Sequence, residues 1–128
     1  MAISIVQLGK PRLSNEGLRI GTVRRPPRGV TKGRYAKDNW YDVWYPELSP
    51  TTELMAQGRS CQSKSDWDAF VRQFRKQMSE PASSHTLDLL SALSQSANFS
   101  IGCYCEQENR CHRSVLRALL KERGANLT

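Results

Sequence analysis

Residues 99–120 consist of an apolar segment, then a polar segment, then an amphipathic segment. Residues 99–105 are short, mostly apolar and bounded by polar residues, which predicts a buried strand. Residues 106–110 are all polar and predict a loop. From about His112 the apolar residues recur with helical spacing, and Gly124 is expected to end that helix. A strand that leads through a loop into a helix is typical of an α/β fold.

This stretch also holds most of the residues that could carry chemistry. Three of the four cysteines and one of the two histidines lie in it: Cys103, Cys105, Cys111 and His112. The first two share one face of the expected strand. The other two fall with Arg113 at the N-terminus of the expected helix, where free N–H groups favour a bound anion and the thiolate form of cysteine.

Several roles are open to these side chains. Cys105 or Cys111 could act as a nucleophile, with His112 or Glu106 as acid or base. The spacing differs from the C-x₅-R loop of cysteine phosphatases, because Cys111 stands where the arginine would be. Buried free cysteine is also an ordinary core residue. A disulfide is not expected, because nothing places the chain in an oxidising compartment.

A metal site is a further alternative for the same residues. Zinc or iron could be held by Cys103, Cys105, Cys111 and His112. However, C-x-C and an adjacent Cys-His pair are not the usual ligand spacings of zinc sites. The sequence therefore requires no metal or other cofactor.

The positive charge is concentrated in one block. Residues 17–37 contain seven basic residues and no acidic one. They are Arg19, Arg24, Arg25, Arg28, Lys32, Arg34 and Lys37. The other 107 positions hold twelve basic and twelve acidic residues, so the net charge of +7 belongs to this block. Such a local excess indicates an anionic ligand or a nucleic-acid backbone, with a solvated basic loop as the alternative.

The remaining pattern completes an α/β arrangement. Strands are expected at 2–8 and 18–24, an aromatic segment at 39–50, and helices from Ser49 to about Gly58, from Ser65 to before Pro81, and from Ser84 to about Gln95. We expect one α/β sandwich domain over residues 1–128, with a short, largely parallel sheet flanked by helices. Ligands bind beyond the carboxyl ends of such strands. The loops after Arg24 and Cys105 should therefore be neighbours and form one pocket.

Three segments carry a resemblance to a known family. They are V-R-R-P-P-R-G at 23–29, S-P-T-T-E-L at 49–54 and C-Y-C-E-Q-E-N-R-C-H-R-S-V-L at 103–116. Over nearly its whole length the chain resembles the bacterial domain-of-unknown-function family 488, the YeaO-like proteins. The resemblance implies a small α/β fold without an assigned function. The matching positions are Arg24, Arg28, Cys105, Glu106, Cys111, His112 and Arg113.

Two functions from different classes follow. The first is an enzyme or ligand-binding protein whose pocket takes phosphate or another small anion. In that pocket Arg24, Arg28 and Arg113 would clamp the anion.

The second function is a nucleic-acid-binding module. The basic loop would contact the backbone and nearby aromatic rings would stack on bases, through Arg25, Lys32, Arg34, Trp40 and Trp44. The aromatic residues could equally pack in the core. No groove-reading motif accompanies them.

The ends of the chain and its hydropathy bear on location. No N-terminal segment has the order of a signal peptide, and no apolar run approaches 18 residues. We therefore expect a soluble cytoplasmic protein with no membrane partner.

Overall fold

The computed structural model describes residues 1–128 as one parallel sheet with four α-helices. The strands are β1 (Ile3–Gln7), β2 (Leu18–Gly21), β3 (Val43–Trp44) and β4 (Phe99–Cys103). The helices are α1 (Thr52–Arg59), α2 (Lys64–Met78), α3 (Pro81–Leu93) and α4 (His112–Glu122). Three 3₁₀ turns lie in the connections: η1 (Lys32–Arg34), η2 (Pro46–Leu48) and η3 (Glu108–Arg110). The predicted α/β fold with a largely parallel sheet is confirmed.

The strand order in the sheet differs from the order along the chain. The strands lie in the order β1-β4-β2-β3, and every neighbouring pair is parallel. Phe99 of β4 is therefore paired with Ile3 on one side and Leu18 on the other. The chain end adds one more link, because Leu127 forms a β-bridge with Ile3 at the outer edge of β1.

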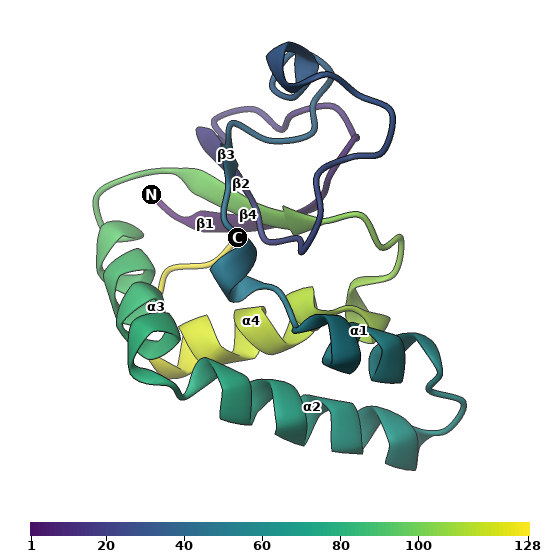
Figure 1. Cartoon of the computed structure of the whole chain (residues 1–128). Coiled ribbons are helices and arrows are strands. Elements are labelled where there is room, and N and C mark those ends of the chain that lie inside the picture. Colours follow the sequence, from purple (N-terminus) through teal and green to yellow (C-terminus); the bar gives the residue numbers. More distant parts are fainter.

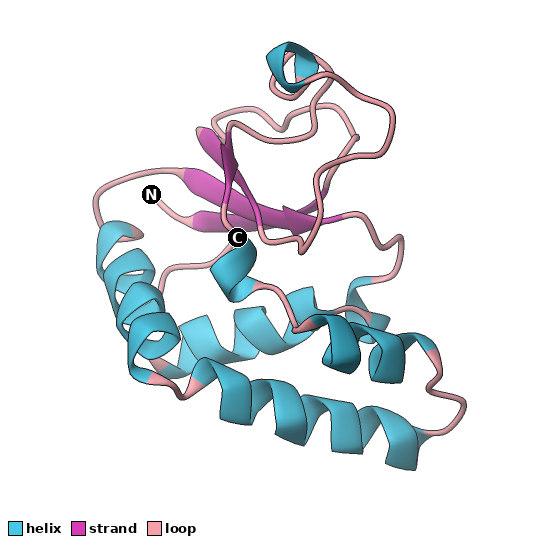
Figure 2. Cartoon of the chain, viewed as in Figure 1, coloured by secondary structure: helices cyan, strands magenta, loops and turns pink.

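Helices cover one side of the sheet and loops cover the other (Figures 1 and 2). The connections from β1 to β2 and from β2 to β3 contain no α-helix, and all four helices follow β3. The loop side therefore carries residues 8–17 and 22–42, including η1 at the top of Figure 1. None of the helices is long and apolar enough to cross a membrane.

The main core lies between the sheet and the helices. Phe70, Phe74 and Met78 of α2 are buried there, as the helical stripe in the sequence predicts. Ile101 of β4 and Leu116 of α4 are fully buried in the same cluster. A second, smaller apolar cluster lies toward the carboxyl ends of the strands and is made of Leu8, Val23, Tyr41, Cys103 and Cys111.

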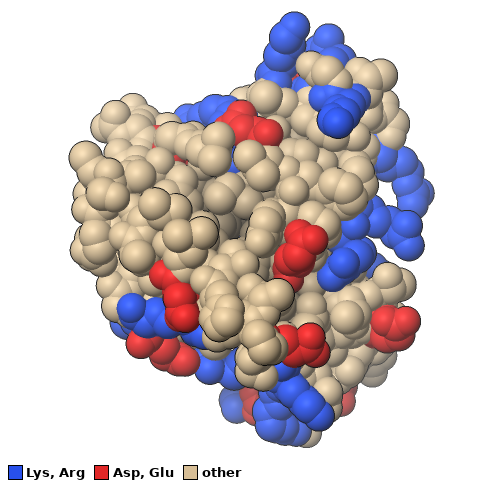
Figure 3. Space-filling view, turned by 60° about the vertical axis from the view of Figure 1, so that its left-hand side comes forward, with Lys and Arg blue, Asp and Glu red and all other residues tan.

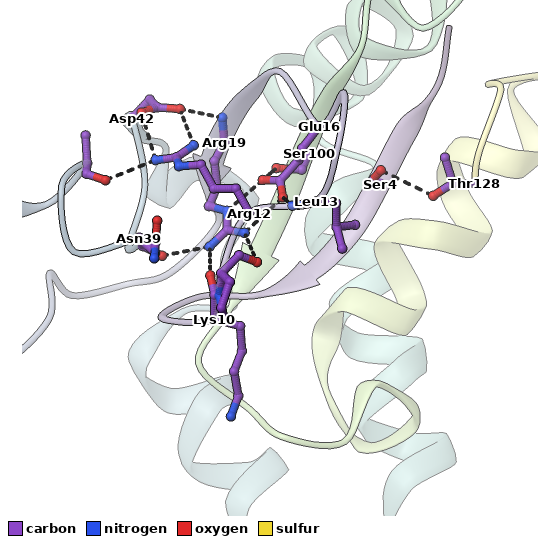
Figure 4. A network of polar contacts seen from close by, with 12 residues as sticks. Ser4, Lys10, Arg12, Leu13, Glu16, Arg19, Asn39, Asp42, Ser100 and Thr128 are labelled. Carbon is purple, nitrogen blue, oxygen red and sulfur yellow. Dashed lines mark hydrogen bonds and ion pairs between the residues drawn. The ribbon is translucent and has the colours of Figure 1, made fainter.

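A buried ion pair holds the loop side together (Figure 4). The Arg19 guanidinium contacts the Glu16 carboxylate at 2.7 Å, and both side chains are 1% exposed. Arg19 also donates to the carbonyl oxygens of Lys10 and Asn39, and Ser100 donates to Glu16. Arg19 therefore contributes nothing to a basic surface, and the prediction that it contacts a nucleic-acid backbone is wrong.

Two helices begin elsewhere than the sequence predicts. Helix α1 is capped by Thr51, whose hydroxyl accepts the Leu54 N–H, while the expected cap Ser49 is buried. Helix α3 begins at Pro81 instead of Ser84. Proline suits the first helical position, because its missing N–H would have had no helical partner there.

Strand β4 ends earlier than expected. It stops at Cys103, so Cys105 lies exposed in the following loop and does not share a strand face with Cys103. Strand β2 likewise stops at Gly21, before Arg24.

Candidate functional site

The loops that follow β2 and β4 touch each other, as their neighbouring strands require. The Tyr104 hydroxyl donates to the Arg25 carbonyl oxygen at 2.8 Å. The His112 ring Nε2 lies 2.7 Å from the Thr22 carbonyl oxygen, which ties the start of α4 to the end of β2. The expectation that these two loops are neighbours is confirmed.

Four side chains in this region form what we call the thiol cluster: Cys103, Cys105, Cys111 and His112. The Cys103 and Cys105 sulfur atoms are 3.8 Å apart, and the Cys111 sulfur lies 3.7 Å from His112 Nδ1. The ligand atoms of Cys103, Cys111 and His112 all lie within 4.8 Å of one another, and these three residues are buried. Cys105 is exposed, and all the cysteines are free thiols. A metal ion is therefore among the groups that this cluster could hold.

The His112 ring has a fixed orientation. A carbonyl oxygen can only accept, so the contact with Thr22 O places the ring proton on Nε2. Nδ1 then presents its lone pair toward the Cys111 sulfur. The ring edge also packs against Phe74, with ring centroids 5.6 Å apart. His112 is thus held between β2 and α2 with one basic nitrogen facing the cysteines.

The thiols differ in acidity because they contact one another. The hydrogen bond donated by Cys103 lowers the pKa of Cys105 and raises the pKa of Cys103. The neighbouring Cys103 thiol also lowers the pKa of Cys111. The pKa values of Cys105 and Cys111 are therefore lowered, while that of Cys103 is raised.

Two of the arginines that were expected to clamp an anion instead donate hydrogen bonds within the protein. Arg24 donates to the carbonyl oxygens of Ser49 and Pro50, and so holds the start of the α1 segment. Arg113 is buried, and it donates to the Cys105 carbonyl oxygen at 2.6 Å. Its Nε has no partner.

The other two residues of the expected first site are on the surface. Arg28 is exposed, and so is Glu106. Neither forms an ion pair, and Glu106 makes no side-chain contact with the thiol cluster. The structure therefore brings the cysteines and His112 together and leaves Glu106 outside.

Within the basic loop, residues 17–37, two of the seven basic side chains form ion pairs. Arg34 pairs with Asp38, just as Arg19 pairs with Glu16. The acidic residues that neutralise the block thus stand immediately outside it, at positions 16 and 38. The cations that remain exposed without an ion pair are Arg25, Arg28, Lys32 and Lys37. In Figure 3, Lys and Arg side chains gather at the top of the molecule, the end where Figure 1 shows η1.

A cavity of about 350 Å³ lies between this basic loop and residues 41–44, and we call it the aromatic pocket. It is lined by Pro26, Lys32, Gly33, Tyr35, Ala36, Tyr41, Asp42 and Trp44. The Tyr41 hydroxyl is buried without a hydrogen-bond partner. Trp40 lies elsewhere, edge-to-face against Tyr104.

Two of the lining rings, Tyr35 and Tyr41, are absent from the set of site residues that the sequence suggested. The feature that indicates the position of the Tyr41 ring is Gly21 at the end of β2. A Cβ at Gly21 would lie 2.4 Å from Tyr41 Cδ2, so only glycine leaves room for this ring. That relation is visible only once the strands are paired.

A second hollow, of about 330 Å³, lies between the C-terminal parts of α3 and α4. Its lining includes the ion pair of Asp88 with Arg123 and no cysteine, histidine or aromatic side chain. It holds none of the candidate site residues that the sequence suggests.

Comparisons with known proteins agree with the motifs at residues 23–29 and 103–116. Residues 3–124 match the family model described as the active DUF488-N3 subclade. No curated protein and no solved structure matches the chain. The matched range contains every strand and α-helix of the fold. The chain therefore belongs to the DUF488 family, the YeaO-like proteins.

Proposed function

We propose that the protein binds a ligand that combines a planar ring with a phosphate, which is the chemistry of a nucleotide. The observation that carries this proposal is the aromatic pocket, where rings and a lysine line one cavity of about 350 Å³. This volume falls at the lower end of the range for small-molecule pockets, about 300–1,000 Å³.

The aromatic walls suit stacking on a flat ring. Tyr35 and Tyr41 lie edge-to-face with centroids 5.2 Å apart. Trp44 is 43% exposed, while its indole N–H donates to the Val23 carbonyl oxygen at 2.7 Å. The indole is thus held in place and still accessible. A ring fixed in this way loses little conformational entropy when a base stacks on it.

The charges around the pocket suit a phosphate. Lys32 lies in the wall, and Arg25 and Arg28 extend from the same loop without ion pairs. Asp42 also lines the pocket, but its carboxylate accepts two hydrogen bonds from Arg12, which compensates its charge. The region therefore carries a net positive charge that would attract an anion.

The Tyr41 hydroxyl supplies a polar group that the protein leaves unused. Burial, followed by the nearby Tyr35, raises the pKa of Tyr41 to about 12, so the hydroxyl keeps its proton near neutral pH. A buried hydroxyl without a partner costs free energy. A ligand would remove that cost only by moving the neighbouring side chains as it binds, because the hydroxyl is shielded from solvent.

The test is a binding titration followed by tryptophan fluorescence and calorimetry. The probes are adenosine monophosphate, inorganic phosphate and a short single-stranded oligonucleotide, each at low and high salt. We expect the ring-bearing probes to bind and phosphate alone to bind far more weakly. A steep fall of oligonucleotide affinity with salt, at unchanged mononucleotide affinity, would identify a nucleic-acid strand as the source of the ligand.

Variants connect any binding to the pocket. Trp44→Ala should weaken binding by about 1–3 kcal/mol, the usual value of one base–aromatic stack. The double variant Arg25→Ala/Arg28→Ala should also weaken it. The matched control is Arg59→Ala/Arg72→Ala, which removes the same charge from two exposed arginines outside the loop. Equal losses in both double variants would contradict a specific pocket, and so would no binding of any ring-bearing probe at low salt.

A further inference from the structure

We propose that the thiol cluster is a tetrahedral metal site with zinc as its occupant. The ligands would be the sulfur atoms of Cys103, Cys105 and Cys111 and the Nδ1 atom of His112. This site is separate from the aromatic pocket, and the proposal does not depend on the ligand bound there.

The distances within the cluster match the edges of a metal tetrahedron. With Zn–S bonds of about 2.3 Å and Zn–N bonds of about 2.0 Å, two sulfur ligands lie about 3.8 Å apart, and a sulfur and a nitrogen about 3.5 Å apart. The Cys103–Cys105 sulfur separation is 3.8 Å, and the Cys111 sulfur lies 3.7 Å from His112 Nδ1. In a tetrahedral site with these four ligands, the two pairs would be opposite edges.

The separations among the three buried ligand atoms are also close to those of a bound site. The ligand atoms of Cys103, Cys111 and His112 lie within 4.8 Å of one another. The longest of these separations is thus no more than about 1 Å beyond a tetrahedral edge.

The His112 ring is already arranged as a metal ligand. Metal-bound histidines usually donate their second ring N–H to a carbonyl or carboxylate, which fixes the tautomer. Here the Nε2 atom lies 2.7 Å from the Thr22 carbonyl oxygen, so the Nδ1 lone pair points into the cluster. Without a metal, its partner is a thiol at 3.7 Å, which is a weak hydrogen bond.

Covalent catalysis suits this arrangement less well than ligation. Cys111, the thiol that faces the histidine, is only 2% exposed and cannot reach a substrate. Cys105 is exposed, but its side-chain contact is with Cys103 and not with His112. In a metal site the same facts are expected: three ligands form a buried floor, and Cys105 completes the tetrahedron from the solvent side.

The donor set selects the metal. Three sulfur ligands and one imidazole nitrogen in a tetrahedral arrangement are typical of zinc, whereas magnesium and calcium require oxygen donors. Four protein ligands leave no open position, so the site would be structural. It would join the end of β4 to the start of α4, next to Tyr41 in the second apolar cluster.

The first test is metal analysis of the full chain, expressed with zinc and purified under reducing conditions. We expect one equivalent of zinc per chain. Exchange for cobalt should give the charge-transfer and d–d absorption bands of a tetrahedral cobalt–thiolate site. Zinc at background level together with no such bands would overturn the proposal. A single equivalent of iron in place of zinc would overturn the assignment of the metal.

Variants assign the ligands, with Cys61 as the matched control because it lies outside the cluster. Cys103→Ser and His112→Ala should reduce bound metal to background, and Cys61→Ser should keep the full equivalent. Cys105→Ser should retain the metal with weaker affinity, because three buried ligands remain. An equal loss in Cys61→Ser would contradict the site. If a buried-ligand variant does not fold, the cobalt spectrum of the wild-type protein and of Cys105→Ser still decides.

Discussion

Glu16 is a buried carboxylate that keeps its charge because hydrogen-bond donors surround it. It accepts from the Leu13 N–H, from the Arg19 guanidinium and from the Ser100 hydroxyl. Burial alone would raise the pKa of Glu16, but these hydrogen bonds and the Arg19 charge outweigh it and lower the pKa to about 2. The folded state thus binds a proton here less readily than the unfolded state does.

The stability of the protein should therefore depend on acid pH through Glu16. Because the pKa falls from 4.5 in the unfolded chain to about 2 on folding, the stabilisation is complete above about pH 4.5. It should be lost as the pH falls toward 2, and it amounts to about 3 kcal/mol. Urea unfolding at a series of pH values measures this slope.

The control for that experiment replaces the whole pair. The double variant Glu16→Gln/Arg19→Met removes both buried charges at similar volume, which is often tolerated. Its free energy of unfolding should vary less between pH 4.5 and pH 3 than that of the wild-type protein. An unchanged slope would assign the acid sensitivity to other carboxylates, such as Asp66 and Glu122, whose pKa values are also lowered.

The sequence shows the basic block, but it does not show which of its residues are buried and which are exposed. Arg19 and Arg25 look alike in the sequence, yet one is fully buried and the other is exposed. The difference arises because the loop of residues 8–17 folds back over the sheet and brings carbonyl oxygens and Glu16 to Arg19. Such long-range closure leaves no periodic pattern in the chain.

At the scale of elements, the end of β2 and the aromatic pocket depend on one close approach. The Tyr41 ring lies directly against the backbone of Gly21, and Tyr41 is 3% exposed. Any side chain at this glycine would push the ring away from the strand, and with it one wall of the pocket.

Gly21→Ala should therefore destabilise the protein and disturb the pocket together. We expect a loss of about 1–3 kcal/mol in the free energy of unfolding, the usual cost of overpacking. Gly33→Ala is the control for the free energy of unfolding, because a Cβ there meets no atom within 4 Å. Urea unfolding gives the energies, and Trp44 fluorescence reports the pocket. A loss in Gly33→Ala as large as that in Gly21→Ala would show that the close contact is not the cause.

The elements themselves were largely predictable, while their ends were not. The stripe of α2 and the final helix follow from the spacing of apolar residues, and the burial of Phe70 and Leu116 confirms both. The sequence predicts that Pro81 ends one helix, and in the structure Pro81 also begins the next. The C-x-C spacing argues against a metal site, because it is not a usual ligand spacing of zinc sites. The end of β4 at Cys103 frees Cys105 to turn back toward it.

For the whole molecule, the C-terminus closes an edge of the sheet. The Ile3 N–H donates to the Asn126 carbonyl oxygen at 2.9 Å, and the Thr128 N–H donates to the Ile3 carbonyl oxygen at 3.0 Å. These bonds occupy groups of β1 that would otherwise face outward. Open edges of this kind promote pairing between chains.

Removal of residues 126–128 should lower stability and promote self-association. Two lost backbone hydrogen bonds correspond to about 1–3 kcal/mol. Urea unfolding and size-exclusion chromatography measure the two effects. Leu127→Ala keeps both backbone hydrogen bonds and should elute at the same volume as the wild-type protein. If Leu127→Ala associates as strongly as the truncated chain, the apolar contact and not the edge is responsible.

The position of β4 between β1 and β2 has a consequence for how the chain is made. The two N-terminal strands do not touch each other, and each pairs with a strand that begins only at Phe99. A nascent chain emerging from the ribosome therefore cannot pair β1 or β2 with β4 until residues 99–103 have been synthesised. Because contacts between residues distant in the sequence close slowly, the β1–β4 and β2–β4 ladders are expected to form late. β4, the last strand in the sequence, thus lies between β1 and β2, the first two.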